Sequence, residues 1–159
     1  MWRSDNICPA QEHFLSNIIR QKISAATNEI RQDIAPKSTW VLFLPEDEDH
    51  DIGLLFANYL LRLSGQKVIY LGAKVPVDSL KEVIASVKVD HLLLFMVRSR
   101  QINANSEYLT MLSVSFPDQL IHVAGSTRVL GDVAMEGNLK LMKSIDDLEN
   151  QIKMTNHGD

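Results

Sequence analysis

The chain has 159 residues, 45% hydrophobic and 23% charged, which is enough for one globular domain with a proper core and too little for two. Its net charge of −4 provides no basic surface for a phosphate backbone, so these residues are not expected to bind nucleic acid. One cysteine, Cys8, excludes an internal disulfide, and the chain has neither a hydrophobic leader nor an apolar run of 18 residues, so we expect a cytoplasmic protein.

The first predicted element is a helix over residues 10–34. One face of this segment is apolar at steps of four, four, three and four residues: Leu15, Ile19, Ile23, Ala26 and Ile30. Pro36 excludes helical geometry at the residue before it, so residues 35–39 are expected to form a linker. Glu12 shares the apolar face and would point towards the interior. Burying that charge without a partner would cost several kcal/mol, on a scale of roughly 2–7 kcal/mol for a neutral polar group.

From residue 40 onwards the pattern alternates strands and helices. Strands are expected at residues 40–45, 67–71, 90–97, 119–124 and 139–142. Helices are expected at residues 52–63 and 77–88, in a segment that ends near Pro117, and at 145–154, where Ser144 is the cap. This alternation predicts an α/β fold, a Rossmann- or flavodoxin-like, doubly wound sheet of five parallel strands. Short right-handed crossovers favour the strand order 2-1-3-4-5, with a switch point beside the first strand.

An acidic loop after the first strand contains the strongest candidate for a ligand. Glu48, His50 and Gly53 form the pattern E-x-H-x-x-G, and Asp49, between the first two, is a further candidate binding residue. Parallel sheets place their chemistry at the carboxyl ends of strands, so His50 is expected to be an exposed metal ligand. Its other ring nitrogen needs an acceptor, which Glu48 can provide. The plainer alternatives are a solvated histidine that caps the next helix and a glutamate that merely belongs to a surface acidic cluster.

Two motifs together resemble those of the CarH/LitR group of MerR-type, cobalamin-dependent, light-sensing transcriptional regulators. Glu48-x-His50-x-x-Gly53 is similar to the cobalamin-binding motif D-x-H-x-x-G, with glutamate in place of aspartate. Upstream, Trp2 is followed by nine residues and then by Glu12 and His13, which looks like the W-x9-E-H signature of that group. The two motifs, in this order, span most of the chain.

For the lower face of the cofactor, the resemblance implies that His50 is the axial ligand of the cobalt in cobalamin. Glu48 would hold the other ring nitrogen of His50, and Gly53, without a Cβ, would let the nucleotide tail pass between loop and sheet. Gly125 and Ser126, after the fourth strand, are expected near the nucleotide end. These roles make the chain a cofactor-binding sensory domain and not an enzyme.

For the upper face, the resemblance places Trp2, Glu12 and His13 as a cap over the upper cobalt ligand, which in this family is 5′-deoxyadenosyl. Residues 1–36 would be the remnant of a helical bundle, and residues 37–159 the cobalamin-binding domain. We expect the chain to be a piece of a longer protein, with DNA as a partner only through a domain absent from it. A homo-oligomer, dimer or tetramer, is expected.

Two further motifs of cobalamin domains are incomplete in this chain. The family's S-x-L near the end of the third strand has no serine here, where residues 94–97 read Leu-Phe-Met-Val, and the G-G pair after the fourth strand is reduced to Gly125. Two other interpretations stay open: a cobalamin carrier domain of a methyltransferase or mutase, and a module without cofactor that serves oligomerisation or partner binding. His91 and His122, inside strands, are expected to be core histidines and not ligands.

Overall fold

The computed structural model describes residues 8–31, 35–98, 102–130 and 135–157. Its centre is an all-parallel, five-stranded sheet in the order β2-β1-β3-β4-β5, which confirms the predicted topology. The strands agree with the predicted ones to within two residues at each end: β1 (Thr39–Phe43), β2 (Lys67–Gly72), β3 (His91–Met96), β4 (Leu120–Gly125) and β5 (Leu139–Met142).

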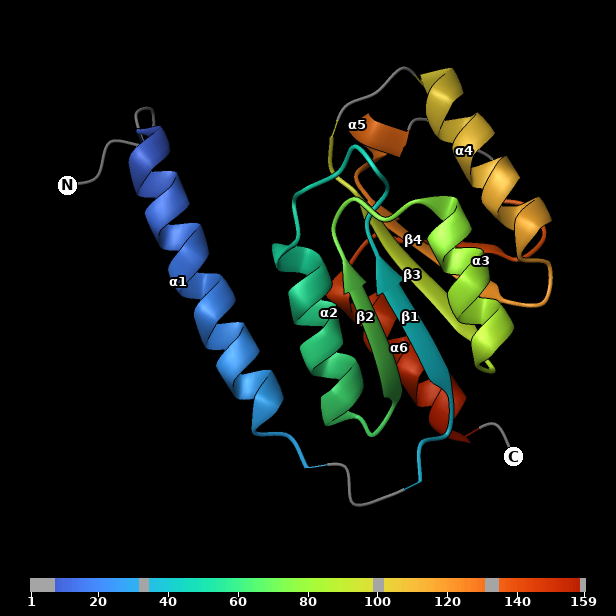
Figure 1. The fold of residues 1–159 in the computed structure, drawn as a ribbon, viewed down its shortest axis with the longest axis horizontal. Coiled ribbons are helices and arrows are strands. Elements are labelled where there is room, and N and C mark those ends of the chain that lie inside the picture. The colour runs from blue at the N-terminus through green and yellow to red at the C-terminus, as the bar shows by residue number, and fades with distance from the viewer. Residues whose placement is uncertain (1–7, 32–34, 99–101, 131–134, 158–159) are drawn as a thin grey trace.

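Helices cover both faces of the sheet (Figure 1). α2 (Ile52–Leu63) and α6 (Ile145–His157) cover one face, and α3 (Val77–Ser86) and α4 (Ile102–Ser115) cover the other. A single short helix that the sequence did not predict, α5 (Thr127–Leu130), follows β4. The hydroxyl of Ser144 accepts a hydrogen bond from the Asp147 amide at 3.2 Å, which confirms the predicted cap of α6.

Apolar side chains on both faces of the central strands bury the sheet between these helices. Val41 and Phe43 of β1 point into the core under α3 and α4, whereas Trp40 and Leu42 point into the core under α2 and α6. Each of these four side chains is fully buried. At about 1.5–3 kcal/mol for each large apolar side chain, such burial is the main term that stabilises the sheet and fixes its carboxyl edge.

The first helix, α1 (Pro9–Asn28), is shorter than predicted. The expectation that it continues to residue 34 is wrong, because the helix ends at Asn28 and Glu29 is its C-cap. Thr27 and Asn28 are weak helix formers, so the helix ends well before Pro36 could stop it. Among the described residues, no helix is both long enough and apolar enough to cross a membrane. This includes α1, which has 20 residues.

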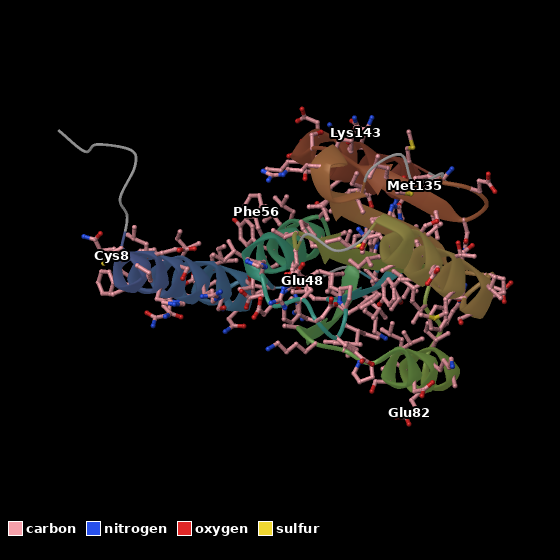
Figure 2. All side chains as sticks on the ribbon, turned by 90° about the horizontal axis from the view of Figure 1, so that it is seen from above. Cys8, Glu48, Phe56, Glu82, Met135 and Lys143 are labelled. Atoms are coloured by element: carbon pink, nitrogen blue, oxygen red, sulfur yellow. The ribbon has the colours of Figure 1, made fainter. Side chains whose placement is uncertain are left out.

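The packed face of α1 agrees with the prediction only in its second half, where Ile23 and Ala26 have reduced exposure. Leu15 and Ile19, expected to be buried, are 52% and 44% exposed, and Glu12 is exposed as well. The positions with reduced exposure include Arg20, Ile23 and Thr27. The reason is that α1 packs mainly on α2 and not on the sheet. Seen from above, α1 projects away from the sheet, with Cys8 at its outer end (Figure 2).

Candidate functional site

A fully buried carboxylate, Glu48, organises the carboxyl edge of the sheet. Its Oε2 accepts hydrogen bonds from the backbone amides of Val97 and Arg98, at 2.9 and 2.7 Å. Its Oε1 accepts hydrogen bonds from the amides of Asp49 and His50, both at 3.1 Å. Burial alone would raise the pKa of Glu48, but these bonds and that of the His50 ring together lower it to about 2. The carboxylate is therefore ionised at neutral pH and joins the ends of β1 and β3.

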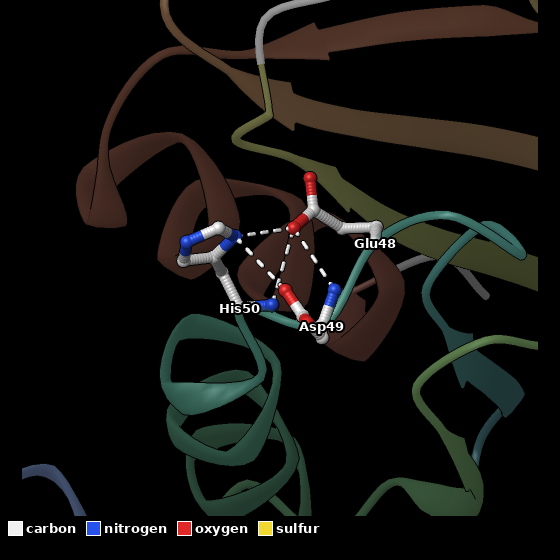
Figure 3. Close-up of side chains that lie close together, drawn as sticks. All are labelled: Glu48, Asp49 and His50. Carbon is white, nitrogen blue, oxygen red and sulfur yellow. Dashed lines mark hydrogen bonds and ion pairs between the residues drawn. The ribbon is translucent and has the colours of Figure 1, made fainter. Parts of the chain in front are cut away.

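The imidazole of His50 is oriented by this carboxylate (Figure 3). Its Nδ1 lies 2.5 Å from Glu48 Oε1, and its side chain is 58% exposed. An ionised carboxylate only accepts hydrogen bonds, so Nδ1 is the donor to Glu48 and Nε2 is the ring nitrogen available for a ligand role. Asp49 Oδ1 is more distant, 3.6 Å from the same Nδ1. The N-cap of α2 is Asp51 and has no side-chain cap bond, so the structure does not support the alternative of His50 as a capping residue.

A cavity of about 540 Å³ lies over His50, between α1 and the edge of the sheet. Elements far apart in the sequence line it: Glu12, His13, Ser16 and Arg20 of α1; Asp49, His50, Ile52 and Gly53; and Phe95 and Val97 at the end of β3. The structure thus brings Glu12 and His13 to the same cavity as His50, whereas Trp2 lies outside the described residues. Sequence reasoning missed Ser16 and Arg20, although they follow Glu12 at steps of four along one helix face.

An ion pair ties α1 to the loop that carries His50. Arg20 Nε lies 2.6 Å from Asp51 Oδ1, with side-chain exposures of 33% and 26%. Arg20 also donates a hydrogen bond to the Ser16 hydroxyl at 3.2 Å. Burial and the nearby Asp51 carboxylate raise the pKa of Tyr70 to about 12, so its hydroxyl stays protonated beside this pair. The pair links the helix that carries Glu12 to the residue that follows His50.

A second, largely apolar cavity of about 470 Å³ opens between α2 and α6 on the same face of the sheet. Its lining includes Phe56 of α2 and Lys143, which lie on the opposite side of the sheet from Glu82 of α3 (Figure 2). Gly125 and Ser126 also line it. A Cβ on Gly125 would lie 2.8 Å from the carbonyl oxygen of Met96, so a larger residue there would separate β4 from β3.

The two cavities meet at Gly53, Phe95 and Val97, which line both. The gap that the sequence suggested beside Gly53 is filled by the ring of Phe95, because a Cβ on Gly53 would lie 2.7 Å from Phe95 Cε1. Phe95 was not among the expected site residues. Its position at the end of β3, where a polar residue was missing, was the signal that sequence reasoning left unused.

His91 and His122 lie away from this edge, in a stack with Trp40. The ring centroids of Trp40 lie 4.1 Å from His91 and 4.8 Å from His122, and His91 Nδ1 is 3.2 Å from His122 Nε2. Burial lowers the pKa of His91 to about 4 and that of His122 to about 3. His122 is fully buried, so the prediction of a core histidine is confirmed.

Comparison with known proteins gives two relatives in sequence, and no family model matches the chain. The HTH-type transcriptional repressor CarH of Myxococcus xanthus is 29% identical over 116 residues, which are 73% of this chain and 38% of the relative. The HTH-type transcriptional repressor CarA of the same organism is 29% identical over 137 residues, 86% of this chain and 44% of the relative. The chain therefore spans less than half the length of the curated relatives that it matches.

Solved structures share the fold. A chain of the methanol:cobalamin methyltransferase complex MtaBC of Methanosarcina barkeri superposes on 95% of this chain. The match covers 59% of that chain, with a TM-score of 0.64 and 18% identity. A cobalamin-binding protein from Desulfitobacterium hafniense matches 92% of this chain and 72% of its own, with a TM-score of 0.58 and 18% identity. The chain is thus homologous to the repressors CarH and CarA, and its fold is the one found in these cobalamin proteins.

Proposed function

We propose that this chain is the cobalamin-binding sensory domain of a transcriptional regulator and is not itself an enzyme. The observation that carries the proposal is that both motifs line one cavity, with His50 on Glu48 at the sheet edge and Glu12 and His13 on α1. Homology to two repressors supports the regulatory role. In this proposal, residues 1–36 form the cap and residues 37–159 the cofactor domain, and DNA binding belongs to a part of the regulator outside this chain.

The described residues fit such a cofactor. A corrin ring supplies four equatorial nitrogens to cobalt and leaves axial positions, for which the neutral imidazole of His50 is a suitable donor. The Glu48 carboxylate keeps the proton on Nδ1 and so directs Nε2 to the metal. The apolar cavity of about 470 Å³ is within the range of small-molecule pockets and offers room for the base of the nucleotide tail. When bound, an alkylcobalamin supplies a light-sensitive cobalt–carbon bond.

We propose adenosylcobalamin as the physiological form. Glu12 and His13 are both exposed on α1, and their side chains provide an acceptor and a donor for a polar upper ligand. Loss of that ligand in light would release α1 from its bound position and change how copies of the chain pack, as a dimer or tetramer. The apolar side chains exposed on α1, among them Phe14 at 66% exposure, are the surface on which such repacking would act.

The proposal is tested by mixing the chain with adenosylcobalamin in darkness, desalting it and recording the absorbance of the protein fraction. We expect the wild type to retain the corrinoid, and green light to change its spectrum. The His50→Ala variant should retain at least about tenfold less corrinoid than the wild type, because the bond between the imidazole and cobalt is lost. Glu46→Gln is the matched control, since this carboxylate of the same loop is exposed and does not line the cavity over His50. A wild type without corrinoid after desalting would refute the proposal.

A carrier domain of a methyltransferase is the second candidate, since MtaBC and the monomethylamine corrinoid protein of Methanosarcina barkeri share the fold. Such a domain would use His50 but has no role for Glu12 and His13. Equal retention of adenosylcobalamin by wild type and His13→Ala, together with a preference for methylcobalamin, would favour the carrier.

A further inference from the structure

One aromatic ring separates the two cavities at the carboxyl edge of the sheet. Gly53, Phe95 and Val97 line both the cavity over His50 and the apolar cavity between α2 and α6. The Phe95 ring lies so close to Gly53 that a Cβ there would be 2.7 Å from Cε1 and 2.9 Å from Cδ1. Carbon atoms that are not bonded need about 3.5–4.0 Å. No further chain of atoms therefore fits between this ring and the first turn of α2.

The surroundings of Phe95 leave its ring able to move. Leu93, two residues earlier on the same face of β3, is fully buried, whereas Phe95 is half-buried. The residue paired with Phe95 across the sheet is Ala124 of β4, whose small side chain leaves room for the ring to turn towards β4. The ring can therefore turn away from Gly53 without opening the core under α2 and α6.

We propose that Phe95 is a gate residue for the nucleotide tail of the corrinoid. In this inference, which rests on the proposed function, the ring closes the passage between the two cavities. A corrinoid with a tail binds only with the ring turned away from Gly53. A corrinoid without the nucleotide, such as cobinamide, needs the cavity over His50 alone and binds without a turn of the ring. Phe95 thus sets how strongly the chain prefers complete cobalamins over tailless ones.

The test compares the dissociation constants of adenosylcobalamin and adenosylcobinamide in darkness for wild type and Phe95→Val. Valine removes the ring and keeps a β-branched residue that suits a strand. We expect the affinity for cobalamin, relative to that for cobinamide, to rise about tenfold in Phe95→Val. Phe56→Ala is the matched control, because Phe56 lines the apolar cavity but not the cavity over His50. This control should not raise the ratio.

An unchanged ratio in Phe95→Val would overturn the gate and leave the proposed function intact. A ratio that falls would do the same, since the ring would then support the tail instead of excluding it. A wild type that binds neither corrinoid would refute the proposed function itself, and the gate with it. Association rates on the unsubstituted chain give a second readout that does not depend on the folding of a variant. Cobalamin should associate at least about tenfold more slowly than cobinamide, and equal rates would contradict the gate.

Discussion

At the residue scale, Glu48 has two functions that depend on its charge. It accepts four backbone amide hydrogen bonds and one from the His50 ring, so it closes the loop after β1 against the end of β3. It also decides which nitrogen of His50 carries the proton. A neutral side chain of the same shape would keep the volume and lose both functions.

Glu48→Gln should therefore lower the free energy of unfolding by about 2–4 kcal/mol, because an amide nitrogen would face buried N–H donors that then lack an acceptor. Urea unfolding at pH 7 measures this loss. Glu46→Gln, an exposed carboxylate in the same loop, is the control and should change stability by less than about 0.5 kcal/mol. A Glu48→Gln variant as stable as the control would show that the amide bonds to this carboxylate contribute little.

The sequence predicted the local part of this site and missed the long-range part. Glu48 and His50 are two residues apart in one loop, so their contact follows from spacing alone. The amides of Val97 and Arg98 that also hold Glu48 come directly after β3, about fifty residues later. No pattern within the acidic loop distinguishes its one buried acid from its exposed neighbours, and the Phe95–Gly53 contact was hidden for the same reason.

At the element scale, α1 shows where periodicity fails. The helix was predicted, but not its end and only part of its packed face, because the apolar spacing rule assumes a broad core beneath the whole helix. α1 packs mainly on α2, and a polar contact, Arg20 with Asp51, sets its position beside His50. Leu15 and Ile19 then remain exposed, although they share a face.

Arg20→Gln should weaken the binding of adenosylcobalamin by about threefold to tenfold and leave that of hydroxocobalamin unchanged, since a small upper ligand does not reach α1. The free energy of unfolding should fall by no more than about 1 kcal/mol, because the ion pair is partly exposed. Titrations of both corrinoids in darkness measure the difference. Arg62→Gln, on the last turn of α2, is the control. Equal losses for the two corrinoids would show that Arg20 does not position α1 over the cofactor.

At the scale of the whole molecule, the order of the strands follows from general rules of chain connection, which is why the sequence predicted it. The stack of Trp40, His91 and His122 is a different kind of feature, because it places two titratable rings within the fold. The Nδ1 of His122 is buried and has no hydrogen-bond partner among the described residues. A proton on either ring would add a charge to a poorly solvated site, close to Lys140 in the case of His122.

These histidines should make the fold sensitive to acid. Their pKa values fall from 6.5 to about 4 and about 3 on folding, so below pH 6.5 the unfolded chain binds more protons than the folded one. Stability is therefore complete above pH 6.5 and is lost as the pH falls through 4 towards 3. Asp90, which favours the charged form of His91, reduces this loss. Below about pH 4.5, protonation of Glu48, whose pKa is lowered to about 2, adds to it in the same direction.

Urea unfolding of the wild type should show a loss of about 3–4 kcal/mol between pH 7 and pH 5, to which each of the two histidines contributes about half. His122→Leu removes the fully buried ring and should reduce this slope by about half. The interval from pH 7 to pH 5 isolates the histidines, because it lies above the range in which Glu48 takes up a proton. If wild type and His122→Leu lost stability equally over this interval, the acid sensitivity would come from groups outside the stack.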